Sequence, residues 1–413
     1  MRMLPLSLLA AVLVLESKAA DWPSFRGPNH DGISTEKNWL GAWPGGQPKQ
    51  LWKKNVGTGY SSMSVAEGRL FTVGNAHDTD TLFCFDANTG AELWKISYTQ
   101  KLDPKYYEGG PSATPTVSGG KVYFVSKQGE VRCLEAATGK EVWVRDIRKE
   151  HGVERPEWGF AGSPLILGKV LFLNAGTHGI ALDATNGDKI WISGKDASGY
   201  SSPVPFTFNG QLTLAVFAAK ALIVVDPKTG QELSRCPWET MYDVNAPDPV
   251  IVGNDLFVTS GYKFLDGPGT GASGALFRPS PGQSKKLWHS KEMASQLSTP
   301  VLVGGHLYGI SGNGDRPGFL RCLDAKTGEV KWSSPEAPMG NLVAADGKIL
   351  WVTGNGELVI VEANPKGYKE LVRAQVSGGK VWSAPVLANG KFYVRNSKGD
   401  VVCVDVKGTG PIQ

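Results

Sequence analysis

Several features that would assign this chain to a nucleic-acid-binding or membrane-spanning class are absent from its sequence. The formal net charge is only +4 over 413 residues, with Lys and Arg interspersed among Asp and Glu, so no dense basic face is available for a nucleic acid. After residues 1–20 no apolar run approaches the length that a bilayer crossing needs. We therefore expect no nucleic-acid partner and no transmembrane segment. Helical periodicity is nearly absent as well, which favours a β protein.

Common catalytic signatures are also missing. No Gly-x-Ser-x-Gly nucleophile elbow occurs, and the six histidines are scattered singly, without the paired spacing of a metal site. The densest candidate for a cation is His77–Asp80. It lacks the glycine and the distal glutamate of a calcium loop, so we expect a solvated loop there. The sequence assigns no catalytic residue and no metal ligand.

The feature that organises the chain is a turn that recurs at regular intervals. In the first copy, Asp86 is followed by Thr89, Gly90 and then Trp94. An Asp side chain accepts hydrogen bonds from the backbone N–H groups that follow it, and Gly adopts positive φ without a Cβ penalty. Each copy follows an alternating apolar run, which predicts a strand. The acids that begin the copies are Asp86, Glu135, Asp183, Asp226 and Asp324, with degenerate copies at Glu362 and Asp405.

The spacing of these turns predicts the fold. Most intervals are about 40–50 residues, which is the period of a four-stranded propeller blade. The interval from Asp226 to Asp324 is about double, so we place a blade without the signature across Val250–His289. The sequence thus predicts an all-β protein, an eight-bladed β-propeller of four-stranded antiparallel blades. The last unit lacks an outer strand, and Gln50–Lys54 resembles one, so we expect an N-terminal strand to close the ring.

The sequence divides into three parts. Residues 1–20 have a basic start, an apolar core and small residues before a cleavage point, which is typical of a secretory signal peptide. Residues 21–49 are predicted to form a leader that packs on the propeller, and residues 50–413 form the propeller. The predicted location is therefore periplasmic or secreted, after cleavage. Within the leader, we expect Trp39 to contribute much less to stability than a repeat tryptophan such as Trp143.

Side chains that recur at one repeat position should serve the packing of the blades. Four of the five cysteines lie two residues before the turn acid. Equivalent positions on neighbouring packed sheets lie about 10 Å apart, too far for a disulfide, so we expect buried free thiols, with Cys236 outside the pattern. Six tryptophans are predicted to dock one blade onto the next, each burying roughly 150–250 Å². They are Trp52, Trp94, Trp143, Trp191, Trp288 and Trp332.

A second set of side chains precedes the predicted innermost strands, which begin with Ser and usually Pro. Loops that lead into these strands should converge on the mouth of the central funnel, where several contacts can act on one ligand. Aromatic residues suit such contacts, although they can also serve only to plug the mouth. The candidate ligand-binding residues are Trp158, Tyr200, Asn245, Gln296 and Trp382, with Tyr106, Tyr107 and Glu157 in equivalent loops.

The repeated turn and the count of eight resemble the pyrroloquinoline-quinone-like (PQQ-like) β-propeller superfamily. Its repeat is an acid, two residues, Thr-Gly, three residues and Trp, and the resemblance covers roughly residues 50–406. The segment Asp21–Pro28 looks like the opening of a group of exported bacterial members. Two branches of the superfamily bracket the function. One comprises the quinone-dependent alcohol dehydrogenases, and the other is the non-enzymatic propeller of outer-membrane protein assembly (BamB-like).

The resemblance implies different residues for the two branches. The dehydrogenases hold PQQ under a ring formed by adjacent cysteines and bind calcium through Glu, Asn and Asp. This chain has no adjacent cysteines and no Cys-x-x-Cys-His haem motif. The leading hypothesis is an exported, monomeric, non-enzymatic propeller without a cofactor that binds a protein, peptide or glycan partner at the funnel mouth, in a scaffold or assembly role. The alternative is a divergent PQQ-dependent alcohol dehydrogenase-like oxidoreductase with PQQ and calcium.

Overall fold

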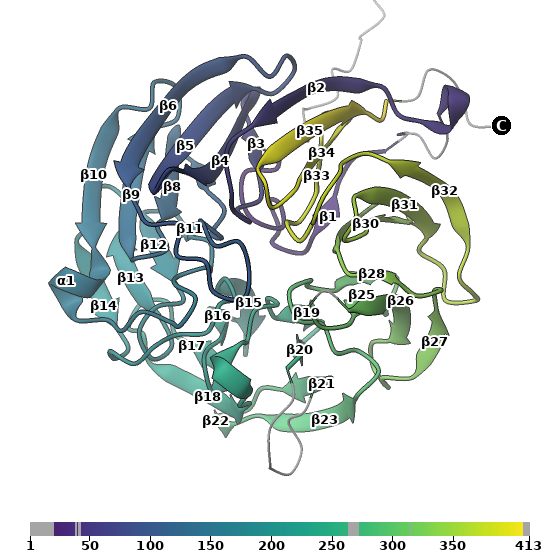
Figure 1. Cartoon of the computed structure of the whole chain (residues 1–413). Coiled ribbons are helices and arrows are strands. Elements are labelled where there is room, and N and C mark those ends of the chain that lie inside the picture. Colours follow the sequence, from purple (N-terminus) through teal and green to yellow (C-terminus); the bar gives the residue numbers. More distant parts are fainter. Residues whose placement is uncertain (1–19, 38, 40–42, 263–271, 315, 408–413) are drawn as a thin grey trace, which may run out of the picture.

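The protein is a ring of eight β-sheets, which confirms the predicted eight-bladed propeller (Figure 1). The computed structural model describes residues 20–37, 39, 43–262, 272–314 and 316–407. The predicted signal peptide therefore lies outside the described residues, apart from residue 20. All five cysteines are buried and unpaired, which confirms the prediction for the four at the repeat position.

Each blade is a four-stranded antiparallel meander that runs from the axis outward. In blade one the order is β3 (Ser64–Ala66), β4 (Arg69–Ala76), β5 (Thr79–Asp86) and β6 (Glu92–Thr99). Blade two consists of β7 (Thr116–Ser118), β8 (Lys121–Val125), β9 (Glu130–Glu135) and β10 (Glu141–Asp146). Blade three consists of β11 (Leu165–Leu167), β12 (Val170–Leu173), β13 (Ile180–Asp183) and β14 (Lys189–Ile192). Blade four consists of β15 (Val204–Phe208), β16 (Gln211–Phe217), β17 (Ala221–Val225) and β18 (Glu232–Pro237).

The second half of the ring repeats this order. Blade five consists of β19 (Val250–Val252), β20 (Asp255–Ser260), β21 (Ser273–Arg278) and β23 (Lys285–Ser290), and blade six of β24 (Val301–Val303), β25 (His306–Ser311), β26 (Pro317–Asp324) and β27 (Val330–Ser333). Blade seven consists of β29 (Asn341–Ala345), β30 (Lys348–Val352), β31 (Glu357–Glu362) and β32 (Glu370–Gln375). Blade eight consists of β33 (Val386–Ala388), β34 (Lys391–Arg395), β35 (Asp400–Asp405) and β2 (Gln50–Asn55). Short additions are β1 (Ile33–Ser34), β22 (Gly282–Gln283), β28 (Ala337–Pro338) and α1 (Ile147–His151).

The ring closes as the sequence predicts. Strand β2 pairs antiparallel with β35 and becomes the outer strand of blade eight, with Trp52 opposite Cys403 and Lys54 opposite Val401. Blade five is complete although its turn lacks the repeat signature. Every blade therefore has four strands, and the first and last parts of the propeller are joined within one sheet.

The docking of neighbouring blades follows from a bulge in each outer strand. In all eight blades the pairing with the third strand shifts by one residue just before the tryptophan position, and such a bulge re-aims the side chain that follows. In six blades that side chain is an indole, which donates from Nε1 to a carbonyl in the turn of the next blade. The pairs are Trp52–Ala87, Trp94–Ala136, Trp143–Ala184, Trp191–Pro227, Trp288–Ala325 and Trp332–Asn364.

The turn glycine packs against the same indole. Gly187 has φ +78°, and a Cβ on it would lie 2.7 Å from Cε3 of Trp143. Gly139 stands in the same relation to Trp94, with φ +73° and 2.6 Å. This glycine is therefore required for two reasons. It adopts the left-handed backbone conformation of the turn, and its lack of a Cβ leaves room for the indole of the preceding blade.

A ring of hydrogen bonds, here called the hydroxyl ring, joins the inner ends of the blades around the axis. Its first links, in chain order, are Ser62 N to Thr114 Oγ1, Thr114 N to Ser163 Oγ, Ser163 N to Ser202 Oγ, Ser202 N to Asp248 Oδ1 and Asp248 N to Thr299 Oγ1. The ring then continues through Asn341, which accepts from Ser298 Oγ and donates to the Trp382 carbonyl. It closes where Ser383 Oγ donates to the Tyr60 carbonyl.

The leader crosses one end of the axis. The carbonyl of Pro23 accepts from Val117 N of blade two at 2.7 Å. The Arg26 side chain is buried and donates to the Thr299 and Pro300 carbonyls at 3.0 Å each. Strand β1 then pairs parallel with β29 of blade seven, with Ile33 opposite Ala344. The leader thus ties blades two, six and seven together across this end.

The environment of Trp39 corrects the expectation that this leader residue contributes little. Its side chain is only 1% exposed and lies in one hydrophobic cluster with Trp22, Trp43 and Trp52. The ammonium of Lys348 lies 5.2 Å from the centroid of the Trp39 ring. The leader tryptophans are therefore core residues, because the leader fills the space under the last and first blades.

Candidate functional site

The antiparallel meander sorts the connections onto two faces. The turns that begin with the repeated acid lie on one face, together with the leader, whose Asp21 carboxylate accepts from Glu67 N at 3.1 Å. The loops from each outer strand to the next inner strand lie on the opposite face, which we call the mouth face. Figure 1 looks onto it, and the segment that follows β6 curls over the centre of the ring.

Three aromatic rings on the mouth face form what we call the Trp382 cluster. The Trp382 ring stacks on Tyr60 with centroids 5.4 Å apart and an interplanar angle of 29°. Tyr107 lies on the other side of Tyr60, at 5.6 Å. The Lys380 ammonium lies 4.4 Å from the centroid of the Trp382 ring, a distance at which a cation is attracted to the ring face. The three rings are partly exposed.

A carboxylate holds this cluster in place. Glu108 accepts hydrogen bonds from the Tyr60 hydroxyl and, at 3.4 Å, from Ser397 Oγ, and it forms an ion pair with Lys380 at 3.3 Å. Burial favours a raised pKa for Glu108, but the Tyr60 hydrogen bond and the Lys380 charge outweigh it and lower the pKa. Burial, together with the Glu108 hydrogen bond, raises the pKa of Tyr60. The network is therefore an ionised carboxylate held by neutral and cationic donors.

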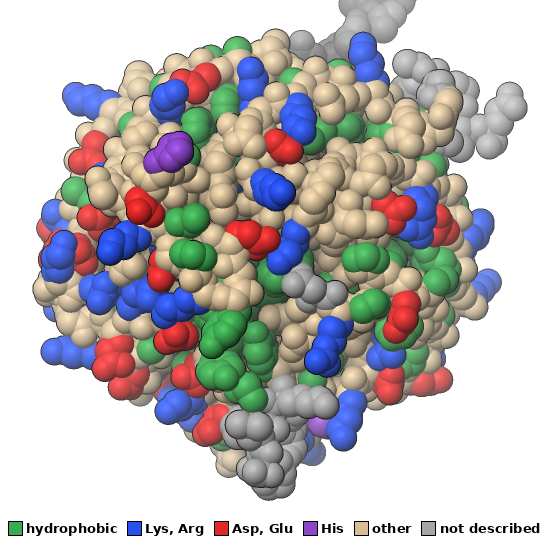
Figure 2. Space-filling view, viewed as in Figure 1, with side chains coloured by type: hydrophobic (Ala, Val, Ile, Leu, Met, Phe, Trp, Pro, Cys, Tyr) green, Lys and Arg blue, Asp and Glu red, His purple; other side chains and the backbone are tan. Residues whose placement is uncertain are grey.

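A second group of rings, the Trp158 cluster, lies on the neighbouring loops. Trp158 contacts Tyr200 at 6.0 Å between centroids and Tyr242 edge-on at 5.6 Å and 85°. Tyr242 contacts Tyr262 at 6.5 Å. Tyr242 is 61% exposed and has φ +60°, a left-handed conformation that non-glycine residues adopt at a cost. Figure 2 shows hydrophobic side chains gathering on this face over the connection between β18 and β19.

A paired set of charges lies between the two clusters. The Asp103 carboxylate contacts Arg155 at 2.5 Å and Lys127 at 3.5 Å, and Lys127 also lies 5.2 Å from the Tyr107 ring centroid. Burial favours a raised pKa for Asp103, but these two cations lower it. Burial raises the pKa of Tyr200, and the Asp243 and Glu157 carboxylates add to the increase. Asp103 is thus held by two cations, and one of them, Lys127, also contacts the Tyr107 ring of the Trp382 cluster.

The five predicted site residues fall into two groups. Trp158, Tyr200 and Trp382 belong to the two aromatic clusters. Asn245 is fully buried, and its amide nitrogen donates to the Ala218 carbonyl at 2.8 Å as well as to two others. The Gln296 amide is buried and bonds the Tyr262 hydroxyl and the Gly314 backbone. The two amides are thus occupied by the fold, and they position loops and rings of the mouth face.

Several residues of the clusters were not among the predicted site residues. Tyr60 precedes Ser61 and Ser62 as Tyr200 precedes Ser201 and Ser202, so the same rule of an aromatic residue before an inner-strand serine could have found it. Tyr242 and Tyr262 follow no repeat phase, and no signal in the sequence marks them.

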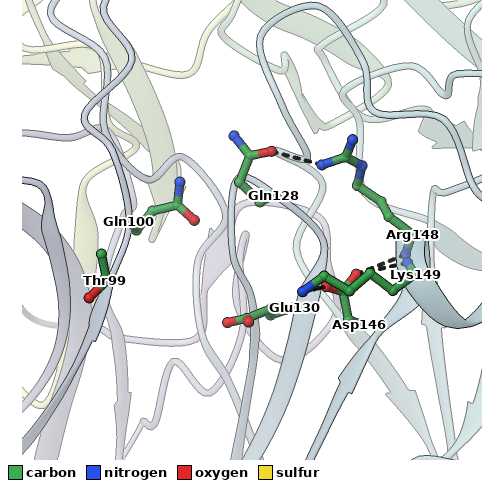
Figure 3. Close-up of a pocket in the computed structure, with 7 residues that line it drawn as sticks. All are labelled: Thr99, Gln100, Gln128, Glu130, Asp146, Arg148 and Lys149. Atoms are coloured by element: carbon green, nitrogen blue, oxygen red, sulfur yellow. Dashed lines mark hydrogen bonds and ion pairs between the residues drawn. The ribbon is translucent and has the colours of Figure 1, made fainter.

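A separate cleft of about 350 Å³ lies at the rim of the ring between blades one and two (Figure 3). Its charged groups are paired locally. Asp146 caps α1 by accepting from Arg148 N and Lys149 N, the Lys149 ammonium contacts Asp146 at 2.9 Å, and Arg148 donates to Gln128 at 2.9 Å. The lining residues are Thr99, Gln100, Gln128, Glu130, Asp146, Arg148 and Lys149. The cleft leaves no unpaired group that would define a ligand.

The segment His77–Asp80 differs from the predicted solvated loop. His77 and Asp78 form an exposed turn, but Asp80 is buried and accepts from Asn75 at 2.6 Å and from the Tyr98 hydroxyl at 3.2 Å. Burial raises the pKa of Asp80 to about 6. The prediction was wrong for Asp80 because this residue is the second of strand β5, whose side chains alternate between solvent and the interior.

The described residues do not fit a calcium-bound quinone. In the described ranges, no three or more His, Cys, Asp or Glu gather where they could hold a metal ion. The five cysteines lie in five different blades, so none can form a ring with a neighbour. Two carboxylates beside the aromatic clusters, Glu108 and Asp103, form ion pairs with cations.

The fold and the site together define a PQQ-like β-propeller with an aromatic mouth face. The family model described as "Outer membrane protein assembly factor BamB" matches residues 44–144, 99–334 and 316–410. These segments cover most of the chain, so the chain belongs to this family.

Individual relatives are distant. The outer membrane protein assembly factor BamB of Moranella endobia is 24% identical over 259 residues, which cover 60% of this chain and 64% of that protein. Among solved structures, BamB from Moraxella catarrhalis has a TM-score of 0.61 at 13% identity, covering 87% of this chain and 99% of that chain. Quinohemoprotein alcohol dehydrogenase from Comamonas testosteroni has a TM-score of 0.65 at 14% identity, covering 95% and 82%. These structural likenesses show the fold alone.

Among the described residues, no helix has the length and apolar character that a membrane crossing requires.

Proposed function

We propose that this protein is an exported, non-enzymatic propeller that binds a partner at the mouth face, in a scaffold or assembly role similar to that named for its BamB relatives. The observation that carries the proposal is the pair of aromatic clusters. Their rings are held by hydrogen bonds and ring contacts, yet Trp158, Trp382 and Tyr242 remain accessible. Rigid, accessible Tyr and Trp rings offer a large contact area at low entropic cost. The predicted signal peptide, residues 1–20, supports export to the periplasm or beyond.

The test is capture of partners by the purified chain from a periplasmic extract, with and without a chemical cross-linker. Trp158→Ala and Trp382→Ala should abolish capture, because each removes the indole of one cluster. The matched control is Tyr106→Ala, since Tyr106 lies next to Tyr107 on the mouth face and is fully exposed. All three variants should melt within about 2 °C of the wild type, as expected for changes at accessible positions. Capture that survives in both tryptophan variants would contradict the proposal.

A second candidate function is a divergent PQQ-dependent alcohol oxidoreductase. The likeness in fold to a quinohemoprotein alcohol dehydrogenase favours it. The charged groups on the mouth face favour the first proposal, because the Glu108 and Asp103 carboxylates are paired with Lys380 and Arg155 rather than gathered around a cation site. The deciding measurement is dye-linked alcohol oxidation after incubation with PQQ and calcium. We expect no turnover above the protein-free control, and saturable turnover would establish the oxidoreductase instead.

A further inference from the structure

We propose that the ligand of the mouth face is an uncharged oligosaccharide, bound across the Trp382 and Trp158 clusters. This inference rests on the proposed function, since it names the class of partner for the same surface. The apolar C–H face of a sugar ring packs on an aromatic ring, while its hydroxyls need donors and acceptors at the ring edge, and a mixed aromatic and polar surface supplies both.

The charge distribution on the mouth face favours an uncharged ligand. Three acids near the rings have basic partners within the surface: Glu108 has Lys380, Asp103 has Lys127 and Arg155, and Glu157 has Lys105 at 2.9 Å. A charged ligand would have to compete with these pairs and would lose its own hydration. A neutral ligand leaves the pairs intact, and they keep the loops in position.

The unused hydrogen-bonding groups of the clusters are neutral. The indole nitrogens of Trp158 and Trp382 are not among the buried unpaired atoms and donate to no group in the described residues. The Tyr262 hydroxyl accepts from Gln296 and belongs to a partly exposed residue. It therefore retains its own proton for a ligand acceptor. Ring oxygens and hydroxyls of a sugar are such acceptors.

An extended peptide fits this surface less well. A peptide strand is normally held by pairing with the free edge of a sheet. At the mouth, the backbone N–H groups that lead into the inner strands are already used in the hydroxyl ring, for example Thr114 N to Ser163 and Ser163 N to Ser202. The mouth therefore offers ring faces and side-chain donors but no open backbone ladder.

The backbone of the clusters supports a binding role independently. Tyr242 of the Trp158 cluster adopts a left-handed conformation, at φ +60°, and its ring is 61% exposed. Non-glycine residues rarely adopt this conformation, and those that do cluster at functional sites. An exposed tyrosine in this conformation is not explained by packing.

The experiment is isothermal titration of the purified chain with neutral hexasaccharides of different linkage, namely cellohexaose, chitohexaose and maltohexaose, and with an anionic heparin hexasaccharide. We expect saturable binding of at least one neutral sugar, weakened about tenfold or more by Trp158→Ala and by Trp382→Ala. Trp382→Phe keeps a ring face and should bind within about threefold of the wild type. Tyr106→Ala lies outside both clusters and should bind within about twofold. Raising the salt from about 0.05 to about 0.5 M should leave the affinity unchanged, because no charge is involved.

Three results would overturn the inference. The first is no heat with any neutral sugar, the second is equal or tighter binding of the anionic hexasaccharide, and the third is neutral-sugar binding that both tryptophan variants retain. Partner capture from the extract is measured in parallel with the same variants. It distinguishes failure of the oligosaccharide inference from failure of the proposed partner-binding function. If sugars do not bind but the tryptophan variants lose a captured protein, the glycan inference is wrong and the mouth face still binds a partner. If neither sugar nor partner depends on Trp158 and Trp382, both proposals fail.

Discussion

The packing of a turn glycine against the indole of the preceding blade gives a stability prediction with a control inside the same blade. Gly187 and Gly168 both lie in turns of blade three with positive φ, at +78° and +62°. A Cβ on Gly168 meets nothing within 4 Å, whereas one on Gly187 would meet Cε3 of Trp143 at 2.7 Å and Cγ of Arg145 at 2.8 Å. Substitution by Ala therefore separates the cost of the backbone from the cost of the ring.

The magnitudes follow from these contacts. Gly168→Ala should cost about 1 kcal/mol, because Ala in the left-handed region costs about 1–2 kcal/mol and loses some of that through a stiffer unfolded chain. Gly187→Ala should cost about 1–3 kcal/mol more, since the added methyl overpacks the interface between blades. With an unfolding entropy of about 2.1 cal/mol/K per residue, each kcal/mol lowers the melting temperature of a chain this long by about 1.2 °C. The expected decreases are thus about 1 °C and about 2–5 °C.

The assay is differential scanning calorimetry of a double-mutant cycle. In a Trp143→Ala background the ring is gone and the contact with Arg145 remains, so Gly187→Ala should cost less than in the wild type, with a coupling of about 1–3 kcal/mol. Additive costs, or equal costs for the two glycine variants in the wild-type background, would refute the reasoning. The turn glycine would then be needed for its φ alone, and the tryptophan would dock through its hydrogen bond and burial only.

Further predictions concern the leader, the axis and the closure of the ring. Trp39→Ala and Trp143→Ala should each cost about 3–5 kcal/mol in calorimetry, and a much smaller loss for Trp39→Ala would mean that the leader does not form part of the core. Burial raises the pKa of Asp248 to about 6 from 3.8, opposed by Arg26, so the folded state binds this proton more tightly than the unfolded state does. The stability that Asp248 contributes is therefore present below about pH 4 and lost as the pH rises through about 6. The stability of Asp248→Asn relative to wild type should accordingly rise by up to about 3 kcal/mol between about pH 4 and about pH 7 in urea unfolding, and a constant difference would contradict it. Deletion of residues 50–55 should expose the edge of β35 and cause aggregation measurable by light scattering; a soluble, monomeric deletion variant would show that the ring does not depend on β2.

The sequence alone determined the architecture because the blade is a repeated local structure. An acid, a Thr-Gly turn and a tryptophan at fixed offsets specify a hairpin wherever they occur, and their spacing counts the blades. The missing outer strand of the last unit, with a spare strand at Gln50–Asn55, was enough to predict how the ring closes. Four of the buried, unpaired cysteines followed from the same logic, since they share one repeat position.

Only the tertiary structure decided what the non-repeating segments do. The leader has no periodicity, so nothing local showed that Trp39 is core or that Arg26 reaches the carbonyls of a blade about 270 residues away. The serines before the inner strands were visible, but the hydroxyl ring they form depends on partners from the next blade. The same reason divides the candidate site. Trp158, Tyr200 and Trp382 could be found because each precedes an inner strand. Asn245 and Gln296 look equivalent in sequence, but their side-chain amides form hydrogen bonds within the fold. Which side chains remain available to a ligand is set by the contacts between blades, and those contacts are not encoded within any one repeat.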